Sequence, residues 1–220
     1  MGNSGRRVNW NYGDAYKQYN MDGDIHIGTG VVRVHDIFNP LPAFMCDADV
    51  IFSDPPYNSS ALSGYYTKAG IQEKPDSFGS FFQRFMECIR EIHPRIVCIE
   101  AGLPQTDDYV NALMKIYARV TVRQSWYYRK QDNKCSIVFA SDNPFPECID
   151  RMPPMDEEQV IDYLCKNLEY KCIGDLCMGK GLVGYYSNKY GKPFVGTELN
   201  SKRLAVCVER VTKNQRGKIL

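Results

Sequence analysis

The sequence predicts an α/β domain, in which helices cover both faces of a mostly parallel β-sheet. Two patterns in the chain predict it. Short runs rich in β-branched and aromatic residues alternate with longer segments whose apolar residues recur at helical spacing. Strand-like runs also end in an acid, at Asp54, Asp175 and Glu198, and ligands bind at the carboxyl edge of a parallel sheet. With 220 residues, the chain is long enough for one well-buried domain, 1–220.

The alternation predicts a seven-stranded sheet that includes one antiparallel hairpin. The expected strands are 30–34, 50–53, 95–100, 120–129, 135–140, 171–175 and 194–198. The expected helices are 77–92, 107–118, 156–167, 181–190 and 201–213. Acids in the first turn of the segment that begins at Asp156 suit the positive end of a helix dipole.

Two segments show neither the alternation of a strand nor the apolar spacing of a helix. Residues 58–76 are rich in Ser, Gly, Tyr and Lys and indicate an active-site loop. Residues 141–155 contain four prolines and indicate a stiff linker between two unequal parts, 21–143 and 153–213.

Composition and charge exclude several classes of protein. The formal net charge is +1, so a large electrostatic footprint for nucleic acid is absent, although a local basic patch is compatible with it. The apolar runs are strand-sized and the first residues are polar, so neither a membrane span nor a signal peptide is expected. The 9 cysteines show no CxxC spacing and no cluster with histidine. We therefore expect no metal site, and the thiols suit a reducing cytoplasm.

The segment CIGDLCMGKGLVGYYSNKYGKPFVGTELN, 172–200, carries the plan of a nucleotide-type cofactor site. A strand ends at Asp175, a turn follows with Gly179 and Gly181, and the next strand ends at Glu198. Glycines let the backbone approach a ligand, and the second acid suits ribose hydroxyls. The glycine pair is equally explained by packing between a strand and a helix. Gly184 stands at the wrong interval for the dinucleotide pattern, which favours an adenosine cofactor without a pyrophosphate.

The segment VIFSDPPYN, 50–58, raises a second question. A strand ends at Asp54, Pro55 and Pro56 fix the backbone direction, and Tyr57 offers a flat ring with a polar tip. Together these residues suit a clamp for a planar group that carries an amine. The alternative is a tight proline turn with a surface acid.

The two motifs together resemble the S-adenosylmethionine-dependent amino-methyltransferases of DNA, which modify adenine N6 or cytosine N4. Residues 54–57 match the family's (D/N/S)PP(Y/F/W), and 175–200 resembles D-P-F-x-G-S-G followed by G-x-E-x-N. The catalytic motif precedes the cofactor motif, which is similar to the circularly permuted β group. The resemblance covers about residues 30–212 and implies a Rossmann-like methyltransferase fold, with 21–143 as catalytic half and 153–213 as cofactor-binding half.

The resemblance implies a role for each catalytic position. Asp54 and the carbonyl of Pro55 would hold the exocyclic amine of a flipped base, while Tyr57, held by Pro56, would stack on its ring. The amine would then attack the methyl group of S-adenosylmethionine directly. The residues implied on the cofactor side are Asp36, Asp54, Asp175, Cys177, Gly179, Lys180, Gly181, Glu198 and Asn200.

The cofactor side departs from the family's pattern at three positions, one of which is Leu176 in place of the common Pro. Cys177 stands where the family usually has Phe, and Lys180 where it usually has Ser. Lys180 is expected either to reach the carboxylate of the cofactor or to point to solvent.

The leading interpretation is a DNA adenine-N6 methyltransferase of a bacterial or phage-type cytoplasm, acting on double-stranded DNA. The alternatives are cytosine-N4 methylation, an RNA amino-methyltransferase, and a non-catalytic partner subunit that retains the fold. No separate target-recognition segment is evident, because only 141–155 lies between the two halves. Binding of the DNA would then depend on a homodimer, on the loop 58–76, or on the aromatic and basic stretch 123–134. The stretch 123–134 is also explained as a plain β-hairpin with a charged turn.

Overall fold

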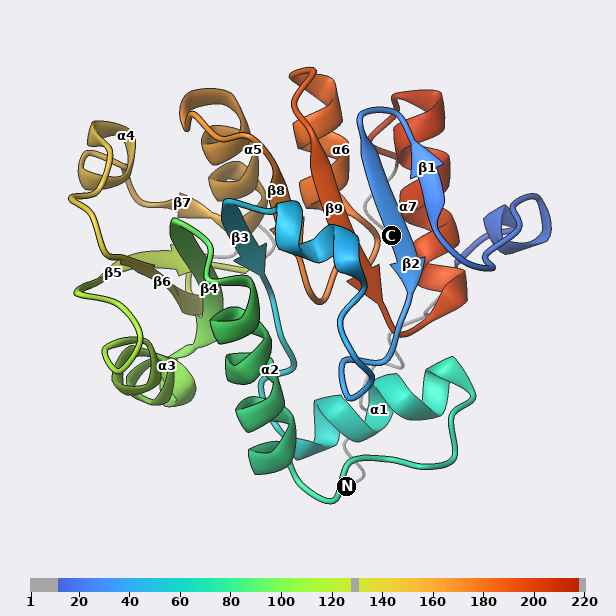
Figure 1. Cartoon of the computed structure of the whole chain (residues 1–220), viewed down its shortest axis with the longest axis horizontal. Coiled ribbons are helices and arrows are strands. Elements are labelled where there is room, and N and C mark those ends of the chain that lie inside the picture. The colour runs from blue at the N-terminus through green and yellow to red at the C-terminus, as the bar shows by residue number, and fades with distance from the viewer. Residues whose placement is uncertain (1–11, 128–130, 218–220) are drawn as a thin grey trace.

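The computed structural model describes residues 12–127 and 131–217, which form a single nine-stranded sheet (Figure 1). The strand order is β1-β2-β9-β8-β3-β4-β6-β5-β7. The strands are β1 (Ile25–Ile27), β2 (Gly30–Val34), β3 (Val50–Ser53), β4 (Ile96–Gly102), β5 (Arg119–Trp126), β6 (Lys134–Ser141), β7 (Met155–Asp156), β8 (Ile173–Asp175) and β9 (Phe194–Glu198).

The sheet is mostly parallel, as predicted. Strands β2, β9, β8, β3 and β4 run parallel to one another, whereas β6 is antiparallel to both β4 and β5. The β5–β6 hairpin confirms the predicted antiparallel pair, although 128–129 of the expected strand lie outside the described residues. The two strands that were not predicted, β1 and β7, have only three and two residues, too few to show a period of two.

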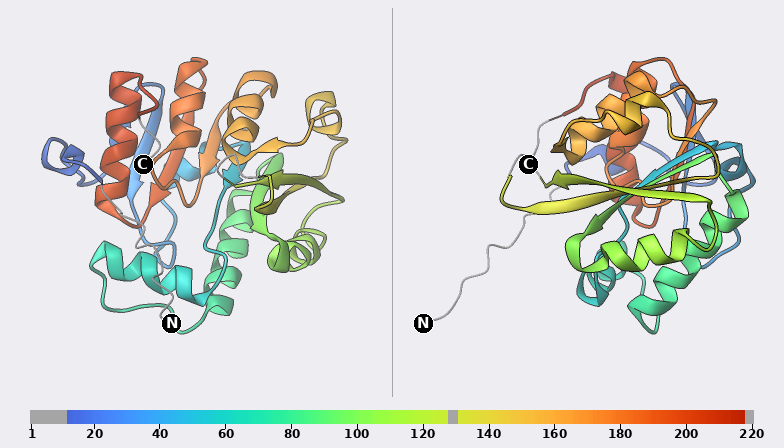
Figure 2. Two further views of the ribbon diagram at one scale, coloured as in Figure 1. Left: turned by 180° about the vertical axis from the view of Figure 1, so that it is seen from behind. Right: turned by 90° about the vertical axis from the view of Figure 1, so that its left-hand side faces the viewer.

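Helices cover both faces of the sheet (Figure 2). Helices α5 (Glu157–Asn167), α6 (Leu182–Lys189) and α7 (Ser201–Lys213) lie on one face, and α2 (Phe78–Ile92) and α3 (Thr106–Leu113) on the other. The remaining elements are α1 (Ser59–Ala69), α4 (Glu147–Asp150) and the short turns η1 (Ala15–Lys17), η2 (Ala43–Asp47) and η3 (Leu103–Gln105). Helix α3 ends five residues before the predicted 118, and residues 114–116 form a turn.

Each face has its own apolar core. Along β3, Phe52 packs into the core shared with α5 and α7, and Ile51 into the core shared with α2 and α3. Both side chains are at most 1% exposed. The central strands are therefore continuous apolar runs, because both of their faces are buried.

The prediction of an irregular loop over 58–76 was wrong for its first half. The Asn58 side chain accepts a hydrogen bond from Ala61 N at 2.9 Å and begins α1, and Gly70 ends it in the left-handed conformation. Leu62 and Tyr66, four residues apart, bury one side of this helix. The predicted linker 141–155 likewise holds α4 and the first residue of β7.

The chain reverses its winding direction between β8 and β3. From β8 it continues through α6 to β9 on one side, and from β3 it continues to β4 on the other. Ligands bind in such folds outside the carboxyl ends of the two strands at this reversal. Helix α1 lies beyond these carboxyl ends, at the bottom of Figure 1. Among the described residues, no helix has the length and apolar character needed to cross a bilayer.

Candidate active site

The two predicted motifs lie on neighbouring strands. β3 and β8 pair in parallel, with Ile51 opposite Gly174. Beyond that pair, Ser53 Oγ donates to Asp175 Oδ1 at 3.0 Å and accepts from Leu176 N at 2.9 Å. Ser53 is fully buried, so this side chain fixes the start of the glycine turn relative to the start of the DPPY segment. Its place in an apolar strand offered no sequence signal for that role.

The glycine turn is built around the Glu198 carboxylate. Gly179 N donates to Glu198 Oε2 at 2.7 Å, and Asn200 N donates to Glu198 Oε1 at 2.9 Å. Gly179 and Gly181 both have left-handed backbones, with φ of 57° and 75°. A Cβ on Gly181 would lie 2.1 Å from Cys207 Sγ in α7. Packing therefore explains Gly181 in part, in agreement with the alternative that the glycine pair serves contact between a strand and a helix. Gly179 and Glu198 shape the turn itself.

A partly buried arginine joins this group. Arg203 Nη1 lies 4.0 Å from Glu198 Oε2, and its guanidinium carbon lies 4.9 Å from the ring centroid of Tyr65 in α1. A Cβ on Gly179 would lie 2.7 Å from Arg203 Nη2, so the guanidinium rests against the turn. Arg203 was not among the predicted site residues, and Tyr65 was expected only as part of the loop 58–76 that would help to bind the substrate. Both come from helices, and only the fold brings those helices to the same strand end.

The DPPY segment forms a compact group at the carboxyl end of β3. Pro55 and Pro56 are buried, whereas Asp54 keeps an exposed surface. The Tyr57 hydroxyl donates to Asp54 Oδ1 and also lies 3.1 Å from Glu100 Oε1. The Tyr57 ring meets Tyr127 edge to face at 5.4 Å between centroids. The Tyr57 hydroxyl thus bonds the same carboxylate that was predicted to hold the amine.

The acids of the site are held in surroundings that disfavour their negative charge. Desolvation raises the pKa of Asp54 to about 6, although the Tyr57 hydrogen bond and Arg203 oppose the shift. Desolvation also raises the pKa of Asp175 to about 7, against the hydrogen bonds from Cys177 N and Ser53. A cationic group placed between these carboxyls would stabilise their ionised forms.

The other predicted cofactor-side residues occupy the same edge in different ways. Asp36, at the end of β2, accepts from the Tyr66 hydroxyl at 2.7 Å and so ties the sheet to α1. Lys180 Nζ lies 5.9 Å from the Tyr12 ring centroid, and burial lowers its pKa, so it is not simply turned to solvent. Cys177 is partly buried beside Asp175, to whose Oδ1 its N–H donates at 3.0 Å.

Asn200 has a double role at this edge. Its Oδ1 caps α7 by accepting from Lys202 N at 2.9 Å. Its Nδ2 is buried and has no hydrogen-bond partner among the described residues. An unpaired buried donor is costly, at about 1–3 kcal/mol, and often marks the position of a ligand atom.

No protein-family model matches the chain, and no curated protein matches it in sequence. Solved structures do match its fold. TTHA0409 of Thermus thermophilus, described as a "Putative DNA Modification Methylase" and crystallised with S-adenosyl-L-methionine, superimposes with a TM-score of 0.55 at 13% identity, covering 79% of this chain and 90% of that one.

Two further structures are similar. M1.HpyAVI matches with a TM-score of 0.53 at 13% identity, covering 81% of this chain and 97% of that one. The PvuII DNA methyltransferase, described as cytosine-N4-specific, matches with a TM-score of 0.55 at 8% identity, covering 86% of this chain and 94% of that one. At these identities the similarity establishes the fold. The predicted Rossmann-like methyltransferase fold is thus confirmed, with nine strands in place of seven.

Proposed function

We propose that this chain is an S-adenosylmethionine-dependent DNA methyltransferase that modifies the exocyclic amine of a flipped base. The observation that carries the proposal is the Ser53–Asp175 hydrogen bond of 3.0 Å, which sets the DPPY segment beside the glycine turn at the strand reversal. The printed names of the three structural neighbours agree with the reaction class.

The residues around the glycine turn fit the proposed cofactor. Glu198 is oriented by two backbone donors and would accept from ribose hydroxyls, and Asn200 Nδ2 supplies a buried donor that lacks a partner among the described residues. The ionised forms of Asp54 and Asp175 are disfavoured where they lie, and a sulfonium cation nearby would stabilise them. When bound, S-adenosylmethionine supplies an electrophilic methyl group, and no covalent enzyme intermediate is required.

The DPPY residues would prepare the amine for attack. Asp54 and the carbonyl of Pro55 accept hydrogen bonds from the amine and hold its lone pair toward the methyl group. The Tyr57 ring would stack on the extruded base and offset, by about 1–3 kcal/mol, the few kcal/mol spent on unstacking it. A nitrogen–carbon bond would replace the carbon–sulfur bond of the cofactor, whose electron pair would stay on sulfur, and the methylated nitrogen would release one proton to water.

We infer adenine N6 as the target because the first residue of the tetrapeptide is Asp54, where the cytosine enzymes more often have serine. The cytosine-N4 description of the PvuII neighbour favours the second candidate. Double-stranded DNA methylated by the chain, digested to nucleosides and analysed by mass spectrometry, decides between them. N6-methyladenine is expected; N4-methylcytosine alone would overturn the adenine assignment.

Two controls test the wider proposal. Parallel incubation with RNA separates a DNA from an RNA enzyme. Calorimetry with S-adenosylmethionine separates an enzyme from a partner subunit that only retains the fold. Methylation of RNA but not of DNA would contradict the proposal. So would the absence of cofactor binding at about millimolar concentration, which corresponds to a binding free energy weaker than about −4 kcal/mol.

A further inference from the structure

Glu100 in β4 is a buried acid that the proposed reaction does not use. It is 1% exposed and stands two residues after Cys98, on the face of the sheet that α5 covers. β3 and β4 pair with Ser53 opposite Ile99, so the register continued by one residue sets Glu100 beside Asp54. A buried carboxyl at this position requires partners, because an isolated charge there is strongly unfavourable.

Among the described residues, the groups that interact with Glu100 are hydroxyls, acids and a thiol, and none of them is a cation. The Tyr57 hydroxyl lies 3.1 Å from Glu100 Oε1. Glu157, at the start of α5, is a second acid of this buried region, and its negative charge adds to desolvation in raising the pKa of Glu100. The titratable groups that face Glu100 are Asp54, Tyr57, Tyr127, Cys135 and Glu157.

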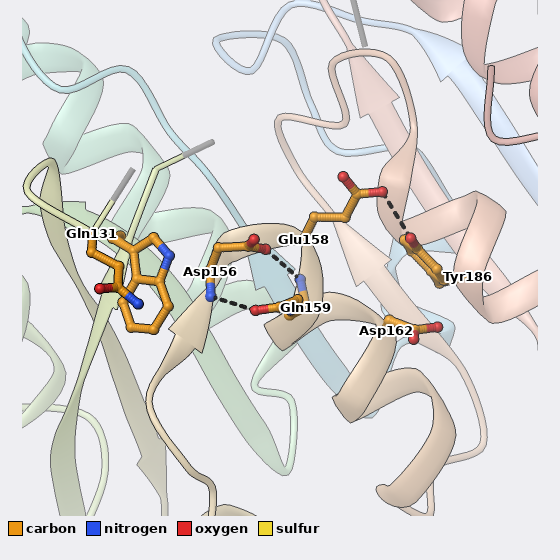
Figure 3. Close-up of a pocket in the computed structure, with 7 residues that line it drawn as sticks. Gln131, Asp156, Glu158, Gln159, Asp162 and Tyr186 are labelled. Carbon is orange, nitrogen blue, oxygen red and sulfur yellow. Dashed lines mark hydrogen bonds between the residues drawn. The ribbon is translucent and has the colours of Figure 1, made fainter. Parts of the chain in front are cut away.

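Glu157 lies between two acids whose carboxylates have other partners. Asp156 caps α5 through Gln159, and Glu158 bonds the Tyr186 hydroxyl at 2.7 Å (Figure 3). Both acids line a surface cavity of 430 Å³. Glu157 itself is only 9% exposed.

Two neighbouring acids in this buried region favour the protonated form of a carboxyl. A protonated carboxyl can both donate and accept a hydrogen bond, whereas an ionised carboxylate has acceptors alone. Desolvation raises the pKa of Glu157 to about 7 and that of Glu100 well above its usual range. The Glu100–Glu157 pair therefore retains one proton near neutral pH.

The Tyr57 hydroxyl has two hydrogen-bond acceptors nearby. Its hydroxyl has one proton and so donates to one oxygen at a time, and here both Asp54 and Glu100 are within reach. An amine bound to Asp54 would compete for that carboxylate. Released without another acceptor, the hydroxyl would be a buried donor with no partner.

We propose that Glu100 is a positioning residue that accepts a hydrogen bond from the Tyr57 hydroxyl when an incoming amine takes Asp54. The exchange leaves the Tyr57 ring anchored at its tip while its face stacks on the base. This inference rests on the proposed function, since it assigns a purpose to an acceptor beside that site.

The activity test compares three variants of the full chain. Glu100→Leu removes the acceptor and should lower kcat about tenfold, with the S-adenosylmethionine dissociation constant unchanged, because the exchange occurs only once the amine arrives. Glu100→Gln retains an oxygen for Tyr57, so kcat should stay within about twofold. In a Tyr57→Phe background, Glu100→Leu should have no further effect. An equal loss in Glu100→Gln, or an undiminished loss in the Tyr57→Phe background, would overturn the inference.

A second measurement is independent of activity. Infrared difference spectra at neutral pH should show a protonated carboxyl band that both Glu100→Gln and Glu157→Gln reduce. Glu147→Gln is the matched control, because Glu147 is an exposed acid paired with Arg151, and it should leave the band unchanged. A band unaffected by both inner variants contradicts the retained proton. A wild-type chain that binds cofactor but methylates no nucleic acid contradicts the proposed function instead, so the two failures are distinct.

Discussion

At the scale of residues, two carboxylates organise different parts of the candidate site. Asp54 lies at the end of β3 and bonds the Tyr57 hydroxyl, whereas Glu198 lies at the end of β9 and orders the glycine turn through Gly179 and Asn200. They share no direct contact among the described residues. Their substitution should therefore affect different steps.

We expect Asp54→Ala to abolish methyl transfer, by at least about a hundredfold, since it removes an acceptor that orients the amine in the transition state. Glu198→Gln should instead weaken the binding of S-adenosylmethionine by about tenfold or more, because one oxygen that accepts a backbone N–H is replaced by a donor. Calorimetry and single-turnover transfer measure the two effects. Equal loss of cofactor affinity in both variants would contradict this division.

Gly181 offers a test of backbone fit. Gly181 and Gly191 both have left-handed backbones, with φ of 75° and 68°, but only at Gly181 would a Cβ overlap another atom, Cys207 Sγ at 2.1 Å. Gly191→Ala should lower the free energy of unfolding by about 1 kcal/mol, and Gly181→Ala by about 2–4 kcal/mol because overpacking is added to the strain. Urea titration measures both, and matching losses would show that Cys207 moves aside without cost.

At the scale of elements, α1 closes the carboxyl edge. Its Tyr65 ring lies against Arg203, and its Tyr66 hydroxyl bonds Asp36. One helix thus contacts the groups around Glu198 and the end of β2. Stability of α1 should therefore be coupled to ligand binding.

The helix caps allow a matched comparison. Asn58 begins α1 and Ser77 begins α2, and each side chain accepts from the N–H three residues on. Asn58→Ala and Ser77→Ala should each lower the free energy of unfolding by about 1 kcal/mol. Only Asn58→Ala should also weaken S-adenosylmethionine binding, because α2 does not carry Tyr65. Unchanged affinity in Asn58→Ala would show that the first turn of α1 does not support the pocket.

At the scale of the whole molecule, carboxyls with raised pKa values set an unusual dependence of stability on pH. The pKa is raised to about 6 for Asp54 and to about 7 for both Asp175 and Glu157, from ordinary values of 3.8 for Asp and 4.5 for Glu. Between about pH 4 and 7 the folded chain therefore holds protons that the unfolded chain has released. Their contribution to stability is complete below pH 4 and is lost as the pH rises toward 7.

We expect the free energy of unfolding to contain a component that falls over this window. Asp175→Asn should flatten the fall by an amount on the order of 1 kcal/mol, because the amide does not ionise. Urea titrations from pH 4 to pH 8 measure it, with Asp150→Asn as a control at a carboxyl whose side chain is 56% exposed. A slope unchanged by Asp175→Asn would contradict the raised pKa of this group.

Whether the sequence predicted a given helix or strand depended on the length of that element's apolar pattern. The strand β6 is a long, largely apolar run and the helix α5 has a clear helical period, whereas β7 has two residues and α1 has a polar, glycine-containing composition. The burial that makes α1 a helix comes from Leu62 and Tyr66 packing on the sheet. That contact is tertiary, so composition alone suggested a loop.

The sequence by itself determined the class of fold and the two motifs, because buried parallel strands must be apolar along their whole length and DPPY and the glycine pair are local patterns. Only the tertiary structure decided that Ser53 bonds Asp175 across 122 residues, that Arg203 lies against the glycine turn, and that Glu100 stands beside Tyr57. The physical reason is register. Parallel pairing of β3 with β8 and β4 selects which distant side chains meet, and no local pattern in the chain encodes that selection.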